Sequence, residues 1–126
     1  MKHVRRDRTI IGATGVVLIV AGTVGFAGAV IPGVSGINAM HDVLHLASGL
    51  FAIRVSLLGK VSACLCCRAM GVLYALVALL GFIADNSAFP VNASDNVFHL
   101  VVAAIFLFIG YREVMPHDHE EAASPI

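Results

Sequence analysis

Four long apolar segments alternate with short polar stretches along the 126 residues of the chain. The first charge-free run extends from Thr9 to Met40, and its apolar part, 10–31, exceeds the ~20 residues that a transmembrane helix needs. Three further segments follow at about 39–58, 69–84 and 96–111. The last two contain about 16 uncharged residues each, so at ~1.5 Å per residue we expect their polar ends to reach into the interface or the bilayer to thin locally. The pattern predicts four transmembrane helices.

The composition agrees with a membrane protein. Apolar residues make up 59% of the chain and charged residues 13%, and the mean hydropathy is +0.92. A soluble domain of this size exposes too much surface for its volume to hide so many apolar side chains, whereas a bilayer can solvate them. The expected fold class is therefore all-α, an integral membrane four-helix bundle with the lipid bilayer as its partner. The net charge of zero gives no indication of a nucleic-acid partner.

The positive charges indicate an orientation. All eight Lys and Arg residues fall on one side if the chain crosses the membrane four times: Lys2, Arg5, Arg6, Arg8, Arg54, Lys60, Arg68 and Arg112. The opposite connections, near 32–40 and 85–95, contain none. By the positive-inside rule the Lys/Arg side is cytoplasmic. We therefore expect a basic cytoplasmic N-terminus at 1–8, a transmembrane domain at 9–112 and a polar cytoplasmic tail at 113–126.

A cleaved signal peptide is the competing interpretation of the N-terminal segment. The basic start, the apolar run and the small residues Ala27-Gly28-Ala29 resemble one. The apolar run is long for the hydrophobic region of a signal peptide, and the repeat described next gives this segment a structural partner. We therefore expect a retained helix.

The second half of the chain repeats the first. Two glycine-containing stretches, at 15–18 and 25–26, match stretches at 71–74 and 81–82 with a constant offset. A proline follows in each outer connection, and the connection of the second copy is two residues shorter. The segment Asn38 to Leu46 then matches Asn92 to Leu100. Each copy is then one helical hairpin, at about 9–58 and 69–112. Because each hairpin contains an even number of spans, both copies insert in the same direction, related by a pseudo-two-fold axis along the membrane normal.

Small residues mark the faces on which helices approach each other. Gly15, Gly22, Gly25 and Gly28 lie largely on one face of the first segment, and Ser48, Ala52 and Ser56 follow at steps of four in the second. Such stripes allow close backbone contact in lipid. Ordinary packing within the bundle and an oligomer interface are both compatible with them.

The repeated polar element resembles a family of small bacterial four-helix membrane proteins, the domain-of-unknown-function 4383 family. Its marks are an N-x-x-H-[DN]-x-x-H-L element and, one hairpin later, an N-x-x-D-N-x-x-H-L element. Here these are Asn38 to Leu46 and Asn92 to Leu100, with Asp42 where Asn is the commoner residue. The resemblance covers roughly Thr9 to Arg112. It implies a four-helix fold in the bacterial cytoplasmic (inner) membrane, and it implies no activity.

The same element contains a group of polar side chains at membrane depth. His41 and His45 are four residues apart and share a helical face, as do Asp95 and His99 in the second copy. Asn38 and Asn92 precede the two helices, where a side-chain oxygen can cap free N–H groups, and Asp42 and Asn96 complete the polar cluster. Ionisable groups at this depth usually face inward and indicate function. We expect His45 and His99 to approach each other inside the bundle.

Three interpretations of this cluster remain open. In the first it is structural, with the asparagines and Asp42 capping helices and the histidines donating hydrogen bonds between hairpins. In the second, His41, His45, Asp95 and His99 bind zinc, copper or iron. In the third, His45 and His99 are axial ligands of a haem or carry protons.

Other motifs give weaker indications. Cys64, Cys66 and Cys67 are compatible with reduced thiols, palmitoylation or metal binding. The tail sequence 117–120 is compatible with loose metal binding or with a solvated tail. No nucleotide loop, nucleophile elbow or HExxH motif occurs. The sequence therefore favours a non-enzymatic membrane protein, an accessory subunit or homo-oligomer without a cofactor, with a metal- or haem-binding redox or transport component as the alternative.

Overall fold

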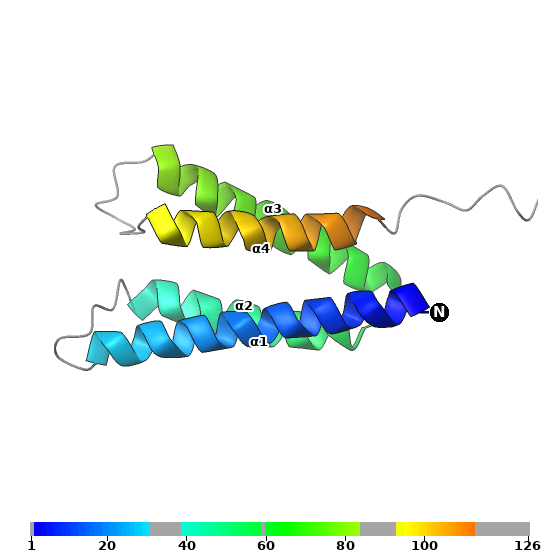
Figure 1. Ribbon diagram of the computed structural model, residues 1–126, viewed down its shortest axis with the longest axis horizontal. Helices are drawn as coiled ribbons and strands as arrows, with labels where there is room; N and C mark the ends of the chain where they lie inside the picture. The colour runs from blue at the N-terminus through cyan, green and yellow to red at the C-terminus, as the bar shows by residue number, and fades with distance from the viewer. Residues whose placement is uncertain (1, 31–38, 59, 84–92, 113–126) are drawn as a thin grey trace, which may run out of the picture.

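The computed structural model describes residues 2–30, 39–58, 60–83 and 93–112, and these residues form four α-helices without a strand (Figure 1). The helices are α1 (Lys2–Val30), α2 (Ala39–Ser56), α3 (Lys60–Ile83) and α4 (Ala93–Arg112). The all-α, four-helix fold is thus confirmed. Asn38, Asn92 and the tail at 113–126 lie outside the described residues, so the expectations about them remain predictions.

Three of the helices extend beyond the segments expected from the uncharged runs. The first begins at Lys2 rather than at residue 10, the third at Lys60 rather than at residue 69, and the fourth at Ala93 rather than at residue 96. The physical reason is that charged residues limit the apolar span but not the helix: Lys and Arg, in α1 and α3, are good helix formers, and Asp95 is favourable in the first turn of α4. The charge-free run therefore underestimates the length of a helix that continues into the polar interface.

Within the described residues, three helices are long and apolar enough to cross a membrane: 5–28, 62–83 and 93–112. The last two contain 22 and 20 residues, which at ~1.5 Å per residue is about 33 and 30 Å, the thickness of the hydrocarbon core. These helices are therefore longer than their uncharged runs of about 16 residues, and the expectation that their polar ends reach into the interface or that the bilayer thins locally remains a prediction. The remaining helix, α2, has 18 residues, and its apolar sequence is interrupted by the polar residues His41, Asp42, His45 and Arg54.

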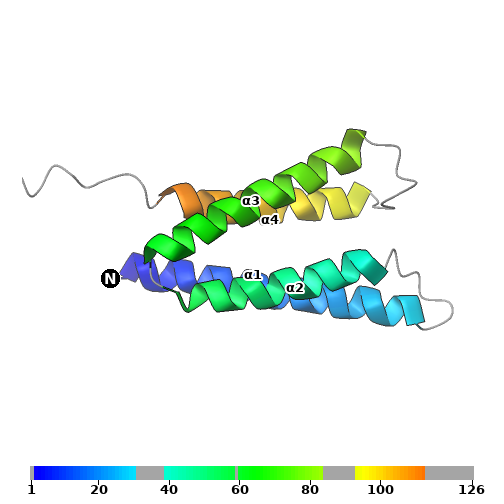
Figure 2. The ribbon, with the colours of Figure 1, turned by 180° about the vertical axis from the view of Figure 1, so that it is seen from behind.

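The helices form two antiparallel hairpins, α1 with α2 and α3 with α4, and the backbones of the two hairpins approach each other closely at far fewer positions than the helices within each hairpin (Figures 1 and 2). Glycine allows the close approach within the first hairpin. A Cβ atom added to Gly15 would lie 2.7 Å from the carbonyl oxygen of Gly49, and one added to Gly49 would lie 2.6 Å from that of Gly15. The small residues of α1 are therefore used for packing within the chain.

Buried side chains fill the space between the helices, and the outward faces are apolar. The core contains Leu18, Ala52, Val55, Cys67, Tyr74, Val102 and Phe106. Large apolar side chains are exposed on all four helices, among them Val20, Leu50, Leu80 and Phe108. In a soluble protein such exposure would be unfavourable, whereas here it provides a surface for contact with lipid.

The described Arg residues gather at one end of the bundle, which we call the basic end. It contains the start of α1, the end of α2, the start of α3 and the end of α4 (Figure 1). Arg112 of α4 donates two hydrogen bonds to the buried carboxylate of Asp7 of α1, at 2.9 and 3.1 Å. Arg8 donates to the carbonyl of Leu58 at 2.9 Å. The ion pair joins the two hairpins at this end, and the opposite end, where α2 and α4 begin, carries the histidines.

Candidate functional site

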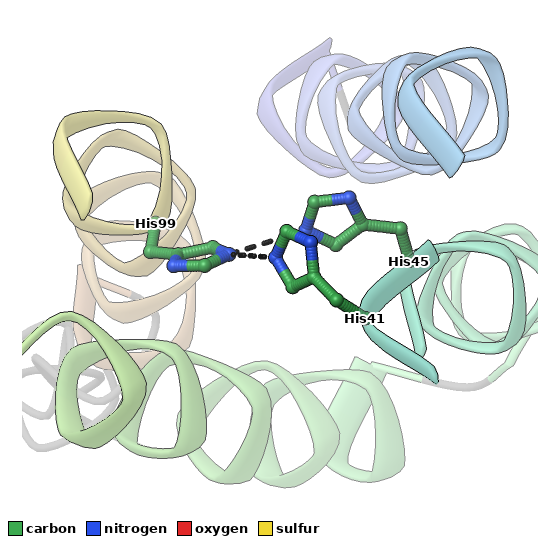
Figure 3. A group of neighbouring side chains, drawn as sticks. All are labelled: His41, His45 and His99. Atoms are coloured by element: carbon green, nitrogen blue, oxygen red, sulfur yellow. Dashed lines mark hydrogen bonds between the residues drawn. The ribbon is translucent and has the colours of Figure 1, made fainter. Parts of the chain in front are cut away.

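Three histidines from two hairpins meet at the end opposite to the basic end (Figure 3). His41 and His45 occupy the first two turns of α2, and the helical spacing of four places both rings on the face that points to the other hairpin. His99 lies in the second turn of α4 and points back between them. We call these three residues the histidine cluster. All three are buried, with exposed fractions of 8%, 5% and 1%.

The ring nitrogens of the histidine cluster converge on one point. Nε2 of His99 lies 3.2 Å from Nε2 of His41 and 3.1 Å from Nε2 of His45. One nitrogen from each ring can be chosen so that all three lie within 4.8 Å of one another. The rings of His41 and His45 are 4.3 Å apart between centroids, and each is tilted steeply against the ring of His99. One nitrogen lone pair from each of the three rings can thus be directed toward the same point.

Hydrogen bonding alone satisfies this arrangement poorly. Each nitrogen of a neutral imidazole has either one proton or one lone pair, directed in the plane of the ring. Nε2 of His99 therefore has one bonding position for two neighbouring nitrogens. In addition, Nδ1 of His41 and Nδ1 of His99 are buried without a hydrogen-bond partner among the described residues. Buried polar atoms usually have such a partner, so the unpaired atoms require an explanation.

A carboxylate lies beside the histidine cluster. Oδ1 of Asp42 is 4.0 Å from Nδ1 of His41, and Oδ2 of Asp42 is a buried oxygen without a partner in the described part of the chain. Asp42 itself is 4% exposed. Its carboxylate packs against the backbone of α1, where a Cβ atom on Gly25 would collide with it. The side chain of Asn96 in α4 packs in the same way against Gly81 of α3.

A cavity of about 380 Å³ opens next to His41 and His45. Its polar lining includes Asp42 and Asp95, and its apolar lining includes Phe98. The other lining residues are Ala21, Val24, Gly25 and Ser94. Asp95 lies one turn before His99, is half-buried, and is close enough to His45 and His99 to interact with them electrostatically. The lining comes from α1, α2 and α4, so the cavity lies between the two hairpins, beside the histidines.

A tyrosine that the sequence analysis did not single out lies next to His99 on its other side. Tyr74 of α3 is 5% exposed, and its ring centroid is 5.7 Å from that of His99. A side-chain hydrogen bond joins Tyr74 to Ser48 of α2. This bond connects the two hairpins one turn below His45. The signal in the sequence was a tyrosine with a polar hydroxyl in the middle of an otherwise apolar segment.

The structure confirms that His45 and His99 face the interior and approach each other. It also brings His41 to the same point. Asp95 lines the same cavity, but its carboxylate is not part of the group of converging ligand atoms. A haem between His45 and His99 is disfavoured, because axial ligands lie on opposite faces of a flat macrocycle and these two nitrogens are only 3.1 Å apart. Cys64, Cys66 and Cys67 are free thiols on α3 near the basic end.

Comparison with known proteins finds one family. The family described as "Domain of unknown function (DUF4383)" has a model that matches residues 8–112, which includes the histidine cluster and nearly all of the four helices. No curated protein and no solved structure matches the chain.

Proposed function

The chain belongs to the DUF4383 family, and, because the family's description names no activity, we propose from the site that it is a membrane protein that binds one transition-metal ion through His41, His45 and His99. The observation that carries this proposal is the convergence of the three Nε2 atoms inside the bundle, at 3.1 and 3.2 Å for the two pairs that include His99. Imidazole is a common ligand for zinc, copper, iron and nickel.

The distances between the nitrogens fit a metal ion. A tetrahedral ion with metal–nitrogen bonds of ~2.0–2.1 Å separates its ligand nitrogens by about 3.3–3.4 Å. The observed separations of 3.1 and 3.2 Å need to change by only a few tenths of an ångström. An ion accepts one lone pair from each ring at the same time, which no arrangement of hydrogen bonds among three imidazoles can do.

Binding through Nε2 also explains the unpaired Nδ1 atom of His41 and the unpaired Oδ2 atom of Asp42. A histidine that binds a metal through Nε2 carries a proton on Nδ1, and that N–H usually donates to a carboxylate or a carbonyl. For His41 the natural acceptor is Asp42, whose carboxylate oxygen is 4.0 Å from Nδ1 and whose second oxygen has no partner among the described residues. A small rotation of either side chain would form this bond.

The fourth coordination position faces the cavity. Asp95, which lines the cavity one turn before His99, is the proposed fourth ligand and would complete the set His41, His45, Asp95 and His99. Histidine nitrogens and a carboxylate oxygen in a tetrahedral set of four are ordinary ligands of zinc.

The proposed setting is the bacterial inner membrane, with four spans and both termini in the cytoplasm. The placement of the described Arg residues at one end of the bundle supports this orientation by the positive-inside rule. Although α2 is not among the three helices that are long and apolar enough to cross a membrane, it packs along α1, so both must lie at the same depth. Its polar side chains His41, Asp42 and His45 are buried in the bundle rather than exposed to lipid.

The two hairpins are proposed to be tandem copies of one ancestral hairpin. Supporting contacts recur at matched positions. Asp42 packs on Gly25 in the first hairpin, and Asn96 packs on Gly81 in the second. In this alignment His45 corresponds to His99 and His41 corresponds to Asp95. The proposed ligand set therefore consists of two residues from each copy.

Metal analysis of the purified protein tests the proposed function. The protein is purified with a histidine-free affinity tag and with His117 and His119 of the tail replaced by Ala, so that loose binding there is removed. After incubation with excess Zn²⁺ and desalting, we expect one ion per chain. His45→Ala and His99→Ala should lose the ion, and His3→Ala, at the basic end, should retain it.

The outcomes separate the interpretations. Stoichiometric zinc that depends on His45 and His99 supports the metal site. A protein that folds but retains no zinc, copper, iron or nickel would instead identify the histidine cluster as a hydrogen-bonded structural contact between hairpins. A Soret band in the optical spectrum would identify haem and would likewise contradict the proposal.

A further inference from the structure

We propose that the cavity beside the histidine cluster is the entry path of the metal ion, and that the carboxylate of Asp42 in its wall attracts the hydrated divalent cation before the histidines bind it. This inference rests on the proposed function, since it concerns how the ion reaches the three histidines. It assigns Asp42 a role in the rate of binding rather than in coordination.

The first argument is the placement of Asp42. It lines the cavity together with His41 and His45, yet it is 4% exposed, and its Oδ2 atom has no partner in the described part of the chain. A carboxylate that is ionised in such a place is unfavourable unless water or a cation solvates it. The cavity provides that space, because about 380 Å³ is far more than the ~30 Å³ that one water molecule occupies.

The second argument is the sign of the charge along the path. The carboxylates that line the cavity belong to Asp42 and Asp95, whereas none of the cavity's lining residues is Arg, and the described Arg residues belong to helix segments toward the basic end. A cleft with walls of low dielectric constant and charge of one sign concentrates ions of the opposite sign. The field in the cavity therefore favours divalent cations over anions.

The third argument is the position of Asp42 relative to the ligands. The converging ligand atoms belong to the three histidines, and Asp42 does not contribute one. Its Oδ1 atom lies 4.0 Å from Nδ1 of His41. Replacing Asp42 by Asn removes the charge and keeps a hydrogen-bond acceptor for His41. The matched position of the second hairpin is Asn96, packed on Gly81 as Asp42 is packed on Gly25, so an amide fits such a site.

Stopped-flow binding of Co²⁺, which develops visible absorption in a tetrahedral nitrogen site, tests the proposal. The protein is placed in nanodiscs of zwitterionic lipid, so that lipid charge does not attract the ion. For Asp42→Asn we expect an association rate about three- to tenfold lower, with weaker dependence on salt, and a dissociation rate that rises by a smaller factor, because the amide oxygen still accepts a hydrogen bond from His41. Glu120→Gln, in the tail at 113–126, removes a carboxylate that the proposed topology places on the opposite side of the membrane, and it should leave both rates unchanged.

A second variant tests the path itself without changing charge. Ala21 lines the cavity from α1, and Ala21→Phe narrows it. A constriction on the path by which the ion enters and leaves slows association and dissociation by the same factor, so we expect both rates to fall and the dissociation constant to stay constant.

The proposal is overturned if Asp42→Asn leaves the association rate unchanged, or changes only the dissociation rate, since Asp42 would then act on the bound ion. It is also overturned if Ala21→Phe changes neither rate. In both cases wild-type binding of Co²⁺ would still support the metal site itself. A wild-type protein that binds no Co²⁺ would overturn both proposals.

Discussion

Nε2 of His45 and Nε2 of His99 lie 3.1 Å apart, although the two residues are 54 positions apart in the chain and belong to different hairpins. Close contacts of this kind are few between the hairpins, because most of the helix packing occurs within each hairpin. Other polar contacts between the hairpins, among the described residues, include the approach of His41 to His99, the Arg112–Asp7 ion pair at the basic end and the Tyr74–Ser48 hydrogen bond. An ion bound by the histidine cluster would therefore join the two halves of the molecule.

The first prediction concerns this coupling. His99→Leu removes the ligand from the second hairpin and should reduce stability by about 1 kcal/mol without metal, since hydrogen bonds between helices in membranes contribute little. Zinc at 100 times its dissociation constant should stabilise the wild type by about 2.7 kcal/mol more than His99→Leu. Thermal unfolding in detergent with and without Zn²⁺ measures both effects. His3→Leu is the control. A zinc-dependent increase in the unfolding temperature that is equal in wild type and His99→Leu would contradict the coupling of the two hairpins by the ion.

The second prediction concerns the packing of the first hairpin. In Gly15→Ala the added methyl group would lie 2.7 Å from a backbone oxygen of Gly49, so the helices must separate, and stability should fall by about 1–3 kcal/mol. Gly12→Ala is the matched control one turn away, where the nearest atom, Oγ of Ser56, is at 3.5 Å. It should be neutral or stabilising, by up to about 1 kcal/mol, because Ala is the better helix former. If Gly15→Ala and Gly12→Ala changed the free energy of unfolding equally in a chemical unfolding assay, the close approach of the two helices at Gly15 would not be required for stability.

The third prediction concerns orientation in the membrane. In a background in which the three native cysteines are replaced by Ala, Ser35→Cys and Ser87→Cys should react with an impermeant thiol reagent added to intact cells. Ser124→Cys should react only after the cells are opened, because the one-sided distribution of Lys and Arg predicts a cytoplasmic tail. Labelling of Ser124→Cys in intact cells would reverse the proposed topology.

Much of the site could be predicted from the sequence, and the reasons are local. The spacing of four between His41 and His45 fixes a common helix face, and the matched position of His99 in the second half places it at a similar depth. The cost of exposing polar groups to lipid then turns these faces inward. Those three facts were sufficient to predict that His45 and His99 meet.

Other features depend on tertiary geometry that no local pattern contains. That His99 points between His41 and His45, while Asp95 stays outside the group of converging atoms, depends on the rotation of α4 relative to α2. The contact of Asp42 with Gly25 depends on the distance between two helix axes. The start of α3 at Lys60 differs from the expected start at residue 69, because the charge-free run ends at Arg68 whereas the helix continues past it.

X-ray absorption at the zinc edge tests the central claim most directly, because it measures the atoms bound to the ion. The protein is loaded with one equivalent of Zn²⁺ and carries the tail substitutions His117→Ala and His119→Ala. We expect three imidazole nitrogens at ~2.0–2.1 Å from zinc in the wild type, and fewer imidazole ligands in His99→Ala. A zinc shell of oxygen atoms alone, or a spectrum that is the same in wild type and His99→Ala, would contradict it.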